Sequence, residues 1–397
     1  MKYDFDSILD RRGHDALAVE MIPIPGAKVA DGVSRIPMWV ADMSFPTAPA
    51  VTEAVRKRLE HPCFGYYMPT DEYWDSIIGW QRRRNGVEDL TRDEIGYENG
   101  VLGCLSTVIA AFTMPGESVL FLSPVYVGFQ GTMEKTGRRV VRSELVKDSR
   151  GIYRMDFADM DRKIKENNIR LAVFCSPHNP CGRVWSREEI RGAMDVFEKN
   201  NCIVFSDEIW SDLVLDGHRH VPTQSVSDYA KHHCIACYAP SKTFSLAGLI
   251  GSYHIIRDAG LKKTVDDKAA ETGYNHMNVL SMHALTGAYS QEGEEWLEEL
   301  LKVLSRNIHY ACDYIAAHFP GVSVTVPEGT YMLFLDCEEY CRNKGRDMDE
   351  LLRAGIASGV IWQDGRTFGG THTIRMNLAV PYSMLQDAFD RLDSSVF

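Results

Sequence analysis

The stretch CIVFSDEI at residues 202–209 joins an apolar run to two acids, and CIACYAPSK at residues 234–242 joins a second apolar run to a lysine. Unbroken apolar runs are typical of strands that are buried on both faces of a parallel sheet. In open parallel sheets, ligands bind beyond the carboxyl ends of the strands. We therefore predict an α/β fold in which Asp207 and Lys242 point into one crevice.

A paired aspartate and lysine suit pyridoxal phosphate chemistry. The lysine amine can carry the cofactor's aldehyde as a Schiff base, and the aspartate can keep the pyridine nitrogen protonated, which makes the ring an electron sink. A Ser-Lys dipeptide alone is weak support, because most lysines are solvated and most aspartates at strand ends cap helices. Other motifs must therefore agree with this interpretation.

Length and charge limit the class of protein. The chain has 397 residues, which exceeds the size at which single cores stop growing, so we predict one large and one smaller domain. The net charge is −12 and no long basic run is present, so nucleic acid and anionic membranes are poor partners. The first residues lack the apolar stretch of a secretory signal, and no later run approaches membrane-spanning length. We expect a soluble cytoplasmic protein.

The ten cysteines are scattered through apparent core strands, which predicts free thiols in a reducing compartment. Cys234 and Cys237 form a C-x-x-C pair, which raises the alternatives of a redox site and a zinc site. On a strand, a separation of three places the two side chains on opposite faces, which neither site tolerates. We interpret both as core residues and expect no metal site.

Strands and helices alternate along most of the chain, which favours a largely parallel sheet covered by helices on both sides. We predict an arm with part of the small domain at 1–45, a large domain at 46–290 and a small α+β domain at 291–397. The predicted strands are 118–122, 139–145, 171–175, 202–206, 234–238, 252–256, 323–326, 331–336 and 373–378. The predicted helices are 48–59, 72–85, 99–112, 156–167, 186–200, 223–231, 294–319 and 348–358.

The helix predicted at 99–112 begins with the glycine-containing sequence NGVLG. A glycine-led start presents free backbone N–H groups and the positive end of the helix dipole, which suits phosphate. The alternative is a buried packing helix with a flexible start. This segment alone favours neither.

An asparagine follows the predicted strand 171–175, in the sequence PHNPCG at 177–182. The amide of Asn179 can donate to a phenolate oxygen, and the neighbouring proline and glycine favour the turn that holds it. Asn-Pro is also common in ordinary turns. The order Asn179, Asp207, Lys242 is what makes this motif informative.

Together these motifs resemble the fold-type I, class I/II aminotransferase superfamily of pyridoxal phosphate enzymes, and most of all the MalY/PatB family of cystathionine β-lyases. The similarity implies a large domain with a mainly parallel seven-stranded sheet between helices, plus a smaller α+β domain. The motifs that carry it are YDFD at 3–6, DRRG at 10–13, PMWVADM at 37–43, FGY at 64–66, SPVY at 123–126, PHNP at 177–180, SDEIWSDL at 206–213, APSKTF at 239–244 and IRMN at 374–377.

The resemblance assigns the cofactor-binding residues position by position. It makes Lys242 the Schiff-base lysine and Asp207 the partner of the pyridine nitrogen. It places Tyr126 against the ring and Asn179 at the ring hydroxyl. The phosphate is then expected at the N–H groups of Val101 and Leu102 and at the hydroxyl of Ser241.

The resemblance also assigns the substrate side of the site. Arg375 is expected to clamp the α-carboxylate of an amino-acid substrate with a bidentate pair, a geometry that a guanidinium supplies. Ala41 and Asp42 fall in the motif expected beside the substrate. Tyr66 is expected to reach the phosphate region of the other subunit's site, which implies a homodimer with shared active sites.

Three positions depart from the family pattern. Trp210 replaces the usual histidine or tyrosine, and an indole N–H can donate but not accept. Ile250 replaces the phosphate-binding arginine of many aminotransferases, an absence that the lyases share. QDGRTF at 363–368 replaces an asparagine-proline-glycine motif, and we hypothesise that Arg366 contacts a distal carboxylate of the substrate.

The residues permit three functions. In each catalytic case the neutral amine of Lys242 removes the Cα proton as general base. A leaving group on Cβ, such as a thiolate, then departs to give pyruvate and ammonia, which defines a cystathionine or cysteine-S-conjugate β-lyase. Without a leaving group the outcome is transamination, so an aminotransferase is the alternative. A regulatory binding protein on the same fold is the third hypothesis.

Overall fold

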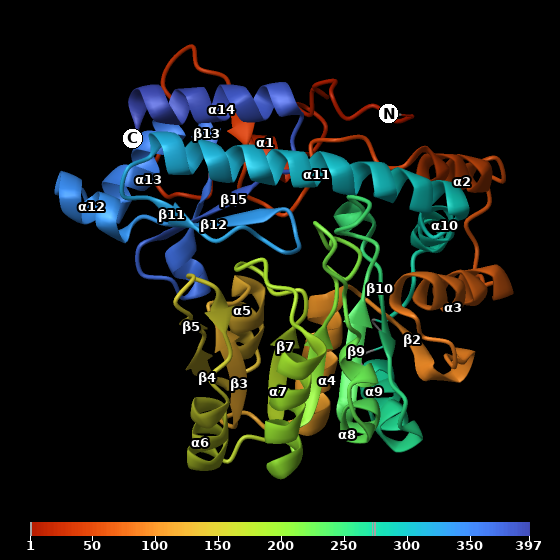
Figure 1. Ribbon diagram of the computed structural model, residues 1–397. Helices are drawn as coiled ribbons and strands as arrows, with labels where there is room; N and C mark the ends of the chain where they lie inside the picture. Colours follow the sequence, from red (N-terminus) through yellow and green to blue (C-terminus); the bar gives the residue numbers. More distant parts are fainter. Residues whose placement is uncertain (1, 272, 274) are drawn as a thin grey trace.

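The computed structural model describes residues 2–271, 273 and 275–397, and its larger sheets have seven and four strands (Figure 1). The α-helices are α1 (Leu17–Glu20), α2 (Pro49–Leu59), α3 (Asp71–Asn85), α4 (Val101–Phe112), α5 (Val127–Lys135), α6 (Phe157–Asn167), α7 (Arg187–Lys199), α8 (Asp228–His233), α9 (Ala259–Glu271), α10 (Val279–Ala288), α11 (Gln291–His318), α12 (Glu338–Lys344), α13 (Met348–Ala357) and α14 (Tyr382–Ser395). The strands are β1 (Ile36–Pro37), β2 (Ile95–Glu98), β3 (Ser118–Ser123), β4 (Arg139–Glu144), β5 (Val146–Lys147), β6 (Tyr153–Arg154), β7 (Leu171–Cys175), β8 (Ile203–Asp207), β9 (Cys234–Tyr238), β10 (Ser252–Ile255), β11 (Ser323–Val324), β12 (Met332–Asp336), β13 (Val360–Ile361), β14 (Gln363–Asp364) and β15 (Thr373–Asn377).

The seven-stranded sheet has the order β2-β10-β9-β8-β7-β3-β4, and β10 alone among its strands runs antiparallel to its neighbours. The register aligns Cys175, Asp207 and Cys237 across β7, β8 and β9. The carboxyl ends of these three strands therefore lie together at one edge, where open sheets bind ligands. The predicted fold class and its six strands in this sheet are confirmed.

Both faces of this sheet are covered, as the unbroken apolar runs predict. One face packs on α6, α7 and α8, and the other packs on α4, α5 and α9. The two cysteines of the C-x-x-C pair separate accordingly, because Cys234 belongs to the first cluster and Cys237 to the second. The prediction that both are core residues is confirmed.

The seventh strand, β2, was not predicted from the sequence. It contains a glycine and an acid instead of an apolar run, so the usual strand signal is missing. Gly96 is needed there, because a Cβ at this position would lie 2.2 Å from the Nε2 of His254 on the neighbouring strand. Tertiary packing thus overrides the local preference.

Most predicted helices are confirmed to within a few residues, but the segment predicted as one helix at 223–231 is divided. A 3-10 turn at Thr223–Ser225 is followed by α8, and Ser227 caps α8 by accepting a hydrogen bond from the N–H of Ala230. Helix α10 was missed because it is buried around most of its circumference and has no polar face. Helices α1, α5, α9, α12 and α14 were also not predicted.

The four-stranded antiparallel sheet has the order β11-β12-β15-β14 and lies beside the long helix α11 (Figure 1). The amino-terminal segment joins this part of the molecule, because β1 pairs in parallel with β13 and the N–H of Asn377 donates to the carbonyl of Met38. This strand pairing brings residues 37–43 next to β15. The proposed domain boundaries near residues 45 and 290 stay predictions.

All ten cysteines lie in the described part of the chain and are free thiols, as predicted. Among residues 2–271, 273 and 275–397, no helix has both the length and the apolar character required to cross a membrane.

Candidate active site

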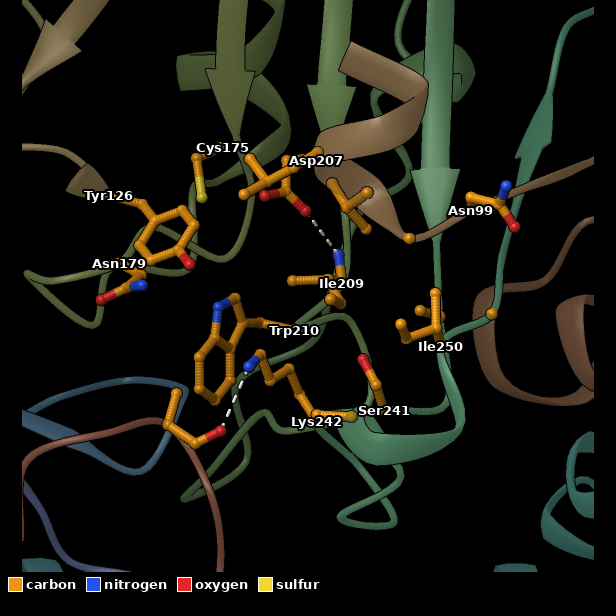
Figure 2. A pocket seen from close by; sticks show the side chains of 17 residues that line it. Asn99, Tyr126, Cys175, Asn179, Asp207, Ile209, Trp210, Ser241, Lys242 and Ile250 are labelled. Atoms are coloured by element: carbon orange, nitrogen blue, oxygen red, sulfur yellow. Dashed lines mark hydrogen bonds between the residues drawn. The ribbon is translucent and has the colours of Figure 1, made fainter. Parts of the chain in front are cut away.

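A cavity of about 320 Å³ lies beyond the carboxyl ends of β7, β8 and β9 (Figure 2). Nine of the predicted site residues line it, and they come from six separate segments of the chain. These nine residues are Ala41, Val101, Leu102, Tyr126, Asn179, Asp207, Trp210, Ser241 and Lys242. The cavity is also lined by residues that the sequence did not single out for the site: Asn99, Gly100, Cys175, Ile209, Ala239, Ala247 and Gly251.

Asp207 is the last residue of β8 and is almost completely buried. Its Oδ1 accepts a hydrogen bond from the N–H of Ile209 at 3.1 Å. Burial raises the pKa of Asp207 to about 7, although the charge of Lys242 opposes this shift. A buried carboxyl with one protein donor favours the arrival of a cationic N–H group.

Lys242 lies in the loop after β9 and is partly buried. Its Nζ donates to the carbonyl of Ala41 at 3.1 Å and lies 6.0 Å from the centre of the Trp210 ring (Figure 2). Burial and the charge of Arg375 lower the pKa of Lys242 to about 8. At pH 7 about a tenth of this amine is therefore unprotonated and nucleophilic.

Tyr126 precedes α5 and turns its ring into the cavity (Figure 2). The ring packs edge-on against Phe129, with centroids 5.5 Å apart. Gly128 makes room for it, because a Cβ at that position would lie 2.4 Å from the Cε1 of Tyr126. Burial raises the pKa of the Tyr126 phenol, so the hydroxyl stays protonated at neutral pH.

Asn179 connects the cavity to the four-stranded sheet. Its Oδ1 accepts a hydrogen bond from Nη1 of Arg375 at 3.2 Å. Arg375 lies on β15, outside the residues that line the cavity, and Nη2 donates to the Trp39 carbonyl at 2.9 Å and to Gln363 Oε1 at 2.5 Å. The two sheets thus meet at this pair.

The guanidinium of Arg375 has spare bonding capacity although it is buried. Its Nε has no hydrogen-bond acceptor among the residues that the structure describes. The group lies 4.4 Å from the centre of the Phe368 ring, and burial lowers its pKa to about 10. Because unpaired buried donors are costly, an incoming carboxylate would be stabilised here.

Helix α4 begins at the cavity with Gly100 at a φ of 76°, a conformation that favours glycine. The first intrahelical hydrogen bond is donated by Cys104, so the N–H groups of Val101 and Leu102 are not used within the helix. Ser241 and Ile250 also line the cavity. Among its described lining residues Lys242 is the one lysine or arginine, which leaves N–H groups and hydroxyls as anion ligands.

Trp210 forms part of the cavity wall and is 2% exposed. Its ring packs edge-on against Tyr331 with centroids 4.9 Å apart. The indole therefore fills space beside Lys242.

Besides Arg375, three predicted site residues lie outside the cavity lining: Tyr66, Asp42 and Arg366. Tyr66 is fully exposed in the loop between α2 and α3. Asp42 is ion-paired with Arg11 and accepts a hydrogen bond from Ser245 at 3.0 Å. These positions leave their predicted roles untested within one protomer.

Arg366 lies in the 3-10 turn Gly365–Phe368, and two carboxylates occupy its guanidinium. Asp364 and Asp349 bind it at 2.8 Å and 2.5 Å, and 40% of its side chain is exposed. The hypothesis that Arg366 contacts a substrate gains no support from this arrangement.

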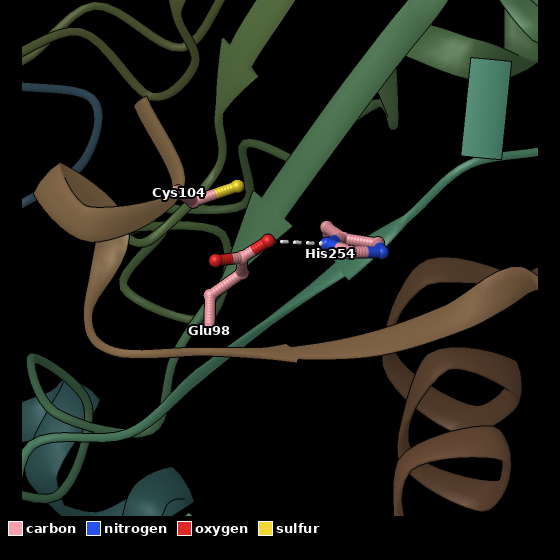
Figure 3. Close-up of side chains that lie close together, drawn as sticks. All are labelled: Glu98, Cys104 and His254. Atoms are coloured by element: carbon pink, nitrogen blue, oxygen red, sulfur yellow. Dashed lines mark hydrogen bonds and ion pairs between the residues drawn. The ribbon is translucent and has the colours of Figure 1, made fainter. Parts of the chain in front are cut away.

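A second buried cluster, Glu98, Cys104 and His254, lies next to the start of α4 (Figure 3). Their potential ligand atoms lie within 4.8 Å of one another. The Nδ1 atom of His254 lies 2.9 Å from the carboxylate of Glu98 and forms a hydrogen bond with it. This hydrogen bond ties β2 to β10.

Comparison with known proteins identifies the family. The model of the family "Aminotransferase class I and II" matches residues 36–392. The chain belongs to this family.

Individual members of the aminotransferase family are similar over nearly the whole chain. "Cystathionine beta-lyase PatB" of Bacillus subtilis (strain 168) is 34% identical over 91% of this chain and 92% of its own length. The crystal structure of a PLP-bound C-S lyase from Staphylococcus hominis is 30% identical, with a TM-score of 0.88 over 99% of this chain and 98% of that one. A PLP-bound putative aminotransferase from Clostridium difficile 630 is 34% identical, with a TM-score of 0.91 over 98% and 99% of the two chains. The predicted resemblance to the superfamily and to its carbon–sulfur lyases is confirmed.

Proposed function

We propose that this chain is a pyridoxal phosphate-dependent carbon–sulfur β-lyase that releases a thiol, pyruvate and ammonia from a cysteine thioether such as cystathionine. The observation that carries the proposal is one cavity in which Lys242 and Asp207 meet, with Arg375 bonded to Asn179 beside it. The lyase relatives at 30% identity or more support the reaction type.

The cavity fits pyridoxal 5'-phosphate in three respects. Within the described part of the chain, the buried carboxyl of Asp207 has no cationic donor at hydrogen-bond distance, and the protonated pyridine nitrogen would supply one. The amine of Lys242 is available for the aldehyde. The unused N–H groups at the start of α4, with Ser241, would hold the phosphate without a cation.

The remaining contacts follow from the same arrangement. Among the described residues, Tyr126 and Trp210 are the aromatic side chains that line the cavity, and Tyr126 would stack on the ring. Asn179 would donate its amide N–H to the ring hydroxyl while its oxygen stays bonded to Arg375.

The reaction needs a base, an anchor and a dry site. When bound, the cofactor supplies an electron sink for the electrons left at Cα. Arg375 would bind the α-carboxylate and orient the Cα–H bond toward Lys242, whose neutral amine removes the proton. The pKa of about 8 makes that neutral form accessible at physiological pH. The proton held at Nζ is then available to the departing thiolate.

An aminotransferase is the second candidate, because the same residues serve both reactions and one similar solved structure carries that description at 34% identity. The two differ in the fate of the substrate's Cβ substituent. Cystathionine and a 2-oxo acid, each assayed on the same preparation, separate them. Pyruvate and free thiol from cystathionine support the lyase, whereas amine exchange without thiol release supports the aminotransferase.

A homodimer with shared active sites is part of the proposal. The loop between α2 and α3 exposes three large apolar side chains, Phe64 (55%), Tyr66 (111%) and Met68 (82%), and a second copy of the chain would cover them. Tyr66 would then enter the partner's cavity. Mixing inactive Lys242→Ala with inactive Tyr66→Ala protein should restore part of the activity, because one site of the mixed dimer is intact.

Covalent trapping tests the central claim. Borohydride reduction followed by peptide mass mapping should find a pyridoxyl adduct at Lys242. A preparation supplied with the cofactor that gives no adduct at this residue would contradict the proposal. A cytoplasmic enzyme of amino-acid metabolism is also part of the proposal, and the free thiols of the ten described cysteines suit a reducing compartment.

A further inference from the structure

Two buried carboxylates connect the segment that carries Asp207 to the segment that carries Lys242. Glu208 and Asp212 both follow β8. The Oε2 atom of Glu208 accepts a hydrogen bond from the hydroxyl of Tyr238, at the end of β9, at 2.7 Å. The Oδ2 atom of Asp212 accepts one from the hydroxyl of Thr243 at 3.0 Å. The two links lie on either side of Lys242 in the sequence.

The bonding capacity of Glu208 is filled on every side. Besides Tyr238, it accepts hydrogen bonds from His220 Nε2 at 2.7 Å, Ser206 Oγ at 2.9 Å and the N–H of Thr223 at 3.1 Å. Burial raises the pKa of the carboxyl, but the contacts from His220 and Tyr238 hold it below its ordinary value. Glu208 is completely buried and is not among the residues that line the cavity.

Asp212 is held in the same way on its other oxygen. Oδ1 accepts a hydrogen bond from the indole N–H of Trp80 at 3.0 Å. Trp80 is itself fixed by stacking on Tyr289, with ring centroids 4.5 Å apart. The link from Asp212 to Thr243 is therefore anchored on α3.

The two reactive side chains have little else to hold them. Asp207 accepts one protein hydrogen bond, from its near neighbour Ile209, and Lys242 donates one, to Ala41 (Figure 2). Their separation therefore depends on how the backbone of residues 207–212 is held against that of residues 238–243. Among the described residues, the Glu208 and Asp212 links are the buried side-chain hydrogen bonds that join these two segments.

We propose that Glu208 and Asp212 are positioning residues that set the separation between the acid at 207 and the amine at 242. This inference rests on the proposed function, because the two groups must contact opposite parts of one cofactor ring. It extends the site to side chains that touch neither cofactor nor substrate. The electronic state of the bound cofactor should then respond to changes at both residues.

The test uses Glu208→Gln and Asp212→Asn in the full chain, with Glu98→Gln as the matched control. Glu98 is an equally buried glutamate of the same sheet, bonded to His254, and it touches neither segment. Three quantities are measured: the melting temperature of the apo-protein, the dissociation constant of the cofactor, and the pH midpoint of the visible absorbance of the bound cofactor. The pH dependence of Lys242 labelling by an amine-reactive reagent in the apo-protein is a fourth readout.

We expect the two variants to move the absorbance midpoint by at least about half a pH unit and to weaken cofactor binding about tenfold, which corresponds to the loss of one or two buried hydrogen bonds. Glu98→Gln should lower the melting temperature about as much as the other two substitutions do. It should leave the absorbance midpoint and the dissociation constant of the cofactor unchanged. If either variant is too unstable to purify, Thr243→Val removes the Asp212 link with a side chain of equal size. Unchanged midpoint, affinity and labelling in all of these variants would overturn the positioning role alone. A parent protein that forms no adduct at Lys242 would overturn the proposed function and this inference together.

Discussion

The end of β8 presents two acids to two different surroundings. Asp207 faces the cavity and has one protein donor, whereas Glu208 faces the interior and has four. The pKa of the first carboxyl is raised by burial, and that of the second is lowered by its donors. The contrast indicates that the carboxyl at the cavity keeps hydrogen-bonding capacity free for a ligand. The buried carboxyl behind it uses all of that capacity for protein contacts that fix the geometry.

The largest effect is expected at the cavity wall. Replacing Lys242 with alanine removes the amine that we propose as both the covalent attachment point and the base, so thiol release should fall by about 10³-fold or more. The measurement is pyruvate release together with mass mapping after borohydride. Lys231→Ala is the control, since this exposed lysine pairs with Asp89, and it should leave rate and adduct unchanged.

The second-largest effect is expected at Asp207 and tests the role that we propose for its carboxyl group. In the proposed mechanism the charge of Asp207 keeps the pyridine nitrogen protonated. Asp207→Asn keeps the shape but removes this charge, so the turnover rate should fall by about 10²-fold with the adduct at Lys242 retained. Stopped-flow absorbance on the purified variant follows the step. A variant with full turnover would remove Asp207 from the mechanism.

Arg375→Lys tests the substrate side. A lysine keeps the charge but loses the fork that meets a carboxylate, so kcat/KM should fall about 30-fold, the equivalent of about 2 kcal/mol. Steady-state kinetics should locate most of the loss in KM. An equal loss with a substrate amide that lacks the α-carboxylate would contradict the assignment.

The two neighbouring acids should respond in opposite directions when apo-protein stability is measured. Below about pH 4 Asp207 is protonated in both the folded and the unfolded chain, and between about pH 4 and 7 only the unfolded chain releases the proton. The free energy of unfolding therefore falls as the pH rises through this window. Asp207→Asn should abolish that fall and raise the melting temperature at pH 8 by about 3 °C, with no gain at pH 4.

Glu208→Gln should do the reverse, because it removes a carboxylate whose charge is stabilised by its donors. The melting temperature should fall at neutral pH, by calorimetry on the same buffers. If both substitutions stabilise the apo-protein, the contrast between the two surroundings is wrong.

The smallest effect is expected at Arg366. Its two aspartate partners are partly exposed, so Arg366→Ala should change kcat/KM by less than about twofold and the free energy of unfolding by less than about 1 kcal/mol. A large rise in KM confined to substrates with a distal carboxylate would instead support the hypothesis drawn from the sequence.

How much was predictable follows from where each residue lies. Asp207 ends β8, and Asn179 and Lys242 lie in the short segments that follow β7 and β9, so an apolar run and its end were enough to predict that they lie close together. The Arg375–Asn179 contact joins two sheets, and no local pattern encodes it. Strand β2 was missed because packing against His254 requires a glycine within it, which interrupts the apolar pattern of a strand. Helix α10 was missed because burial on most sides removes the alternation of polar and apolar residues that marks a helix. The links from Glu208 and Asp212 could have been suspected only as acids that follow a buried strand.

Nη1 of Arg375 donates a hydrogen bond to the amide oxygen of Asn179. A carboxylate bound at this guanidinium would therefore compete with that amide oxygen for one donor. An anion that draws Nη1 toward itself weakens its hold on the amide oxygen, and the amide can then reorient. Binding of an anion at the Arg375 guanidinium would thereby affect, through the side chain of Asn179 alone, the position expected for the oxygen of the cofactor ring. Binding of a substrate carboxylate at Arg375 would then change the visible absorbance of the bound cofactor without any shift of the backbone.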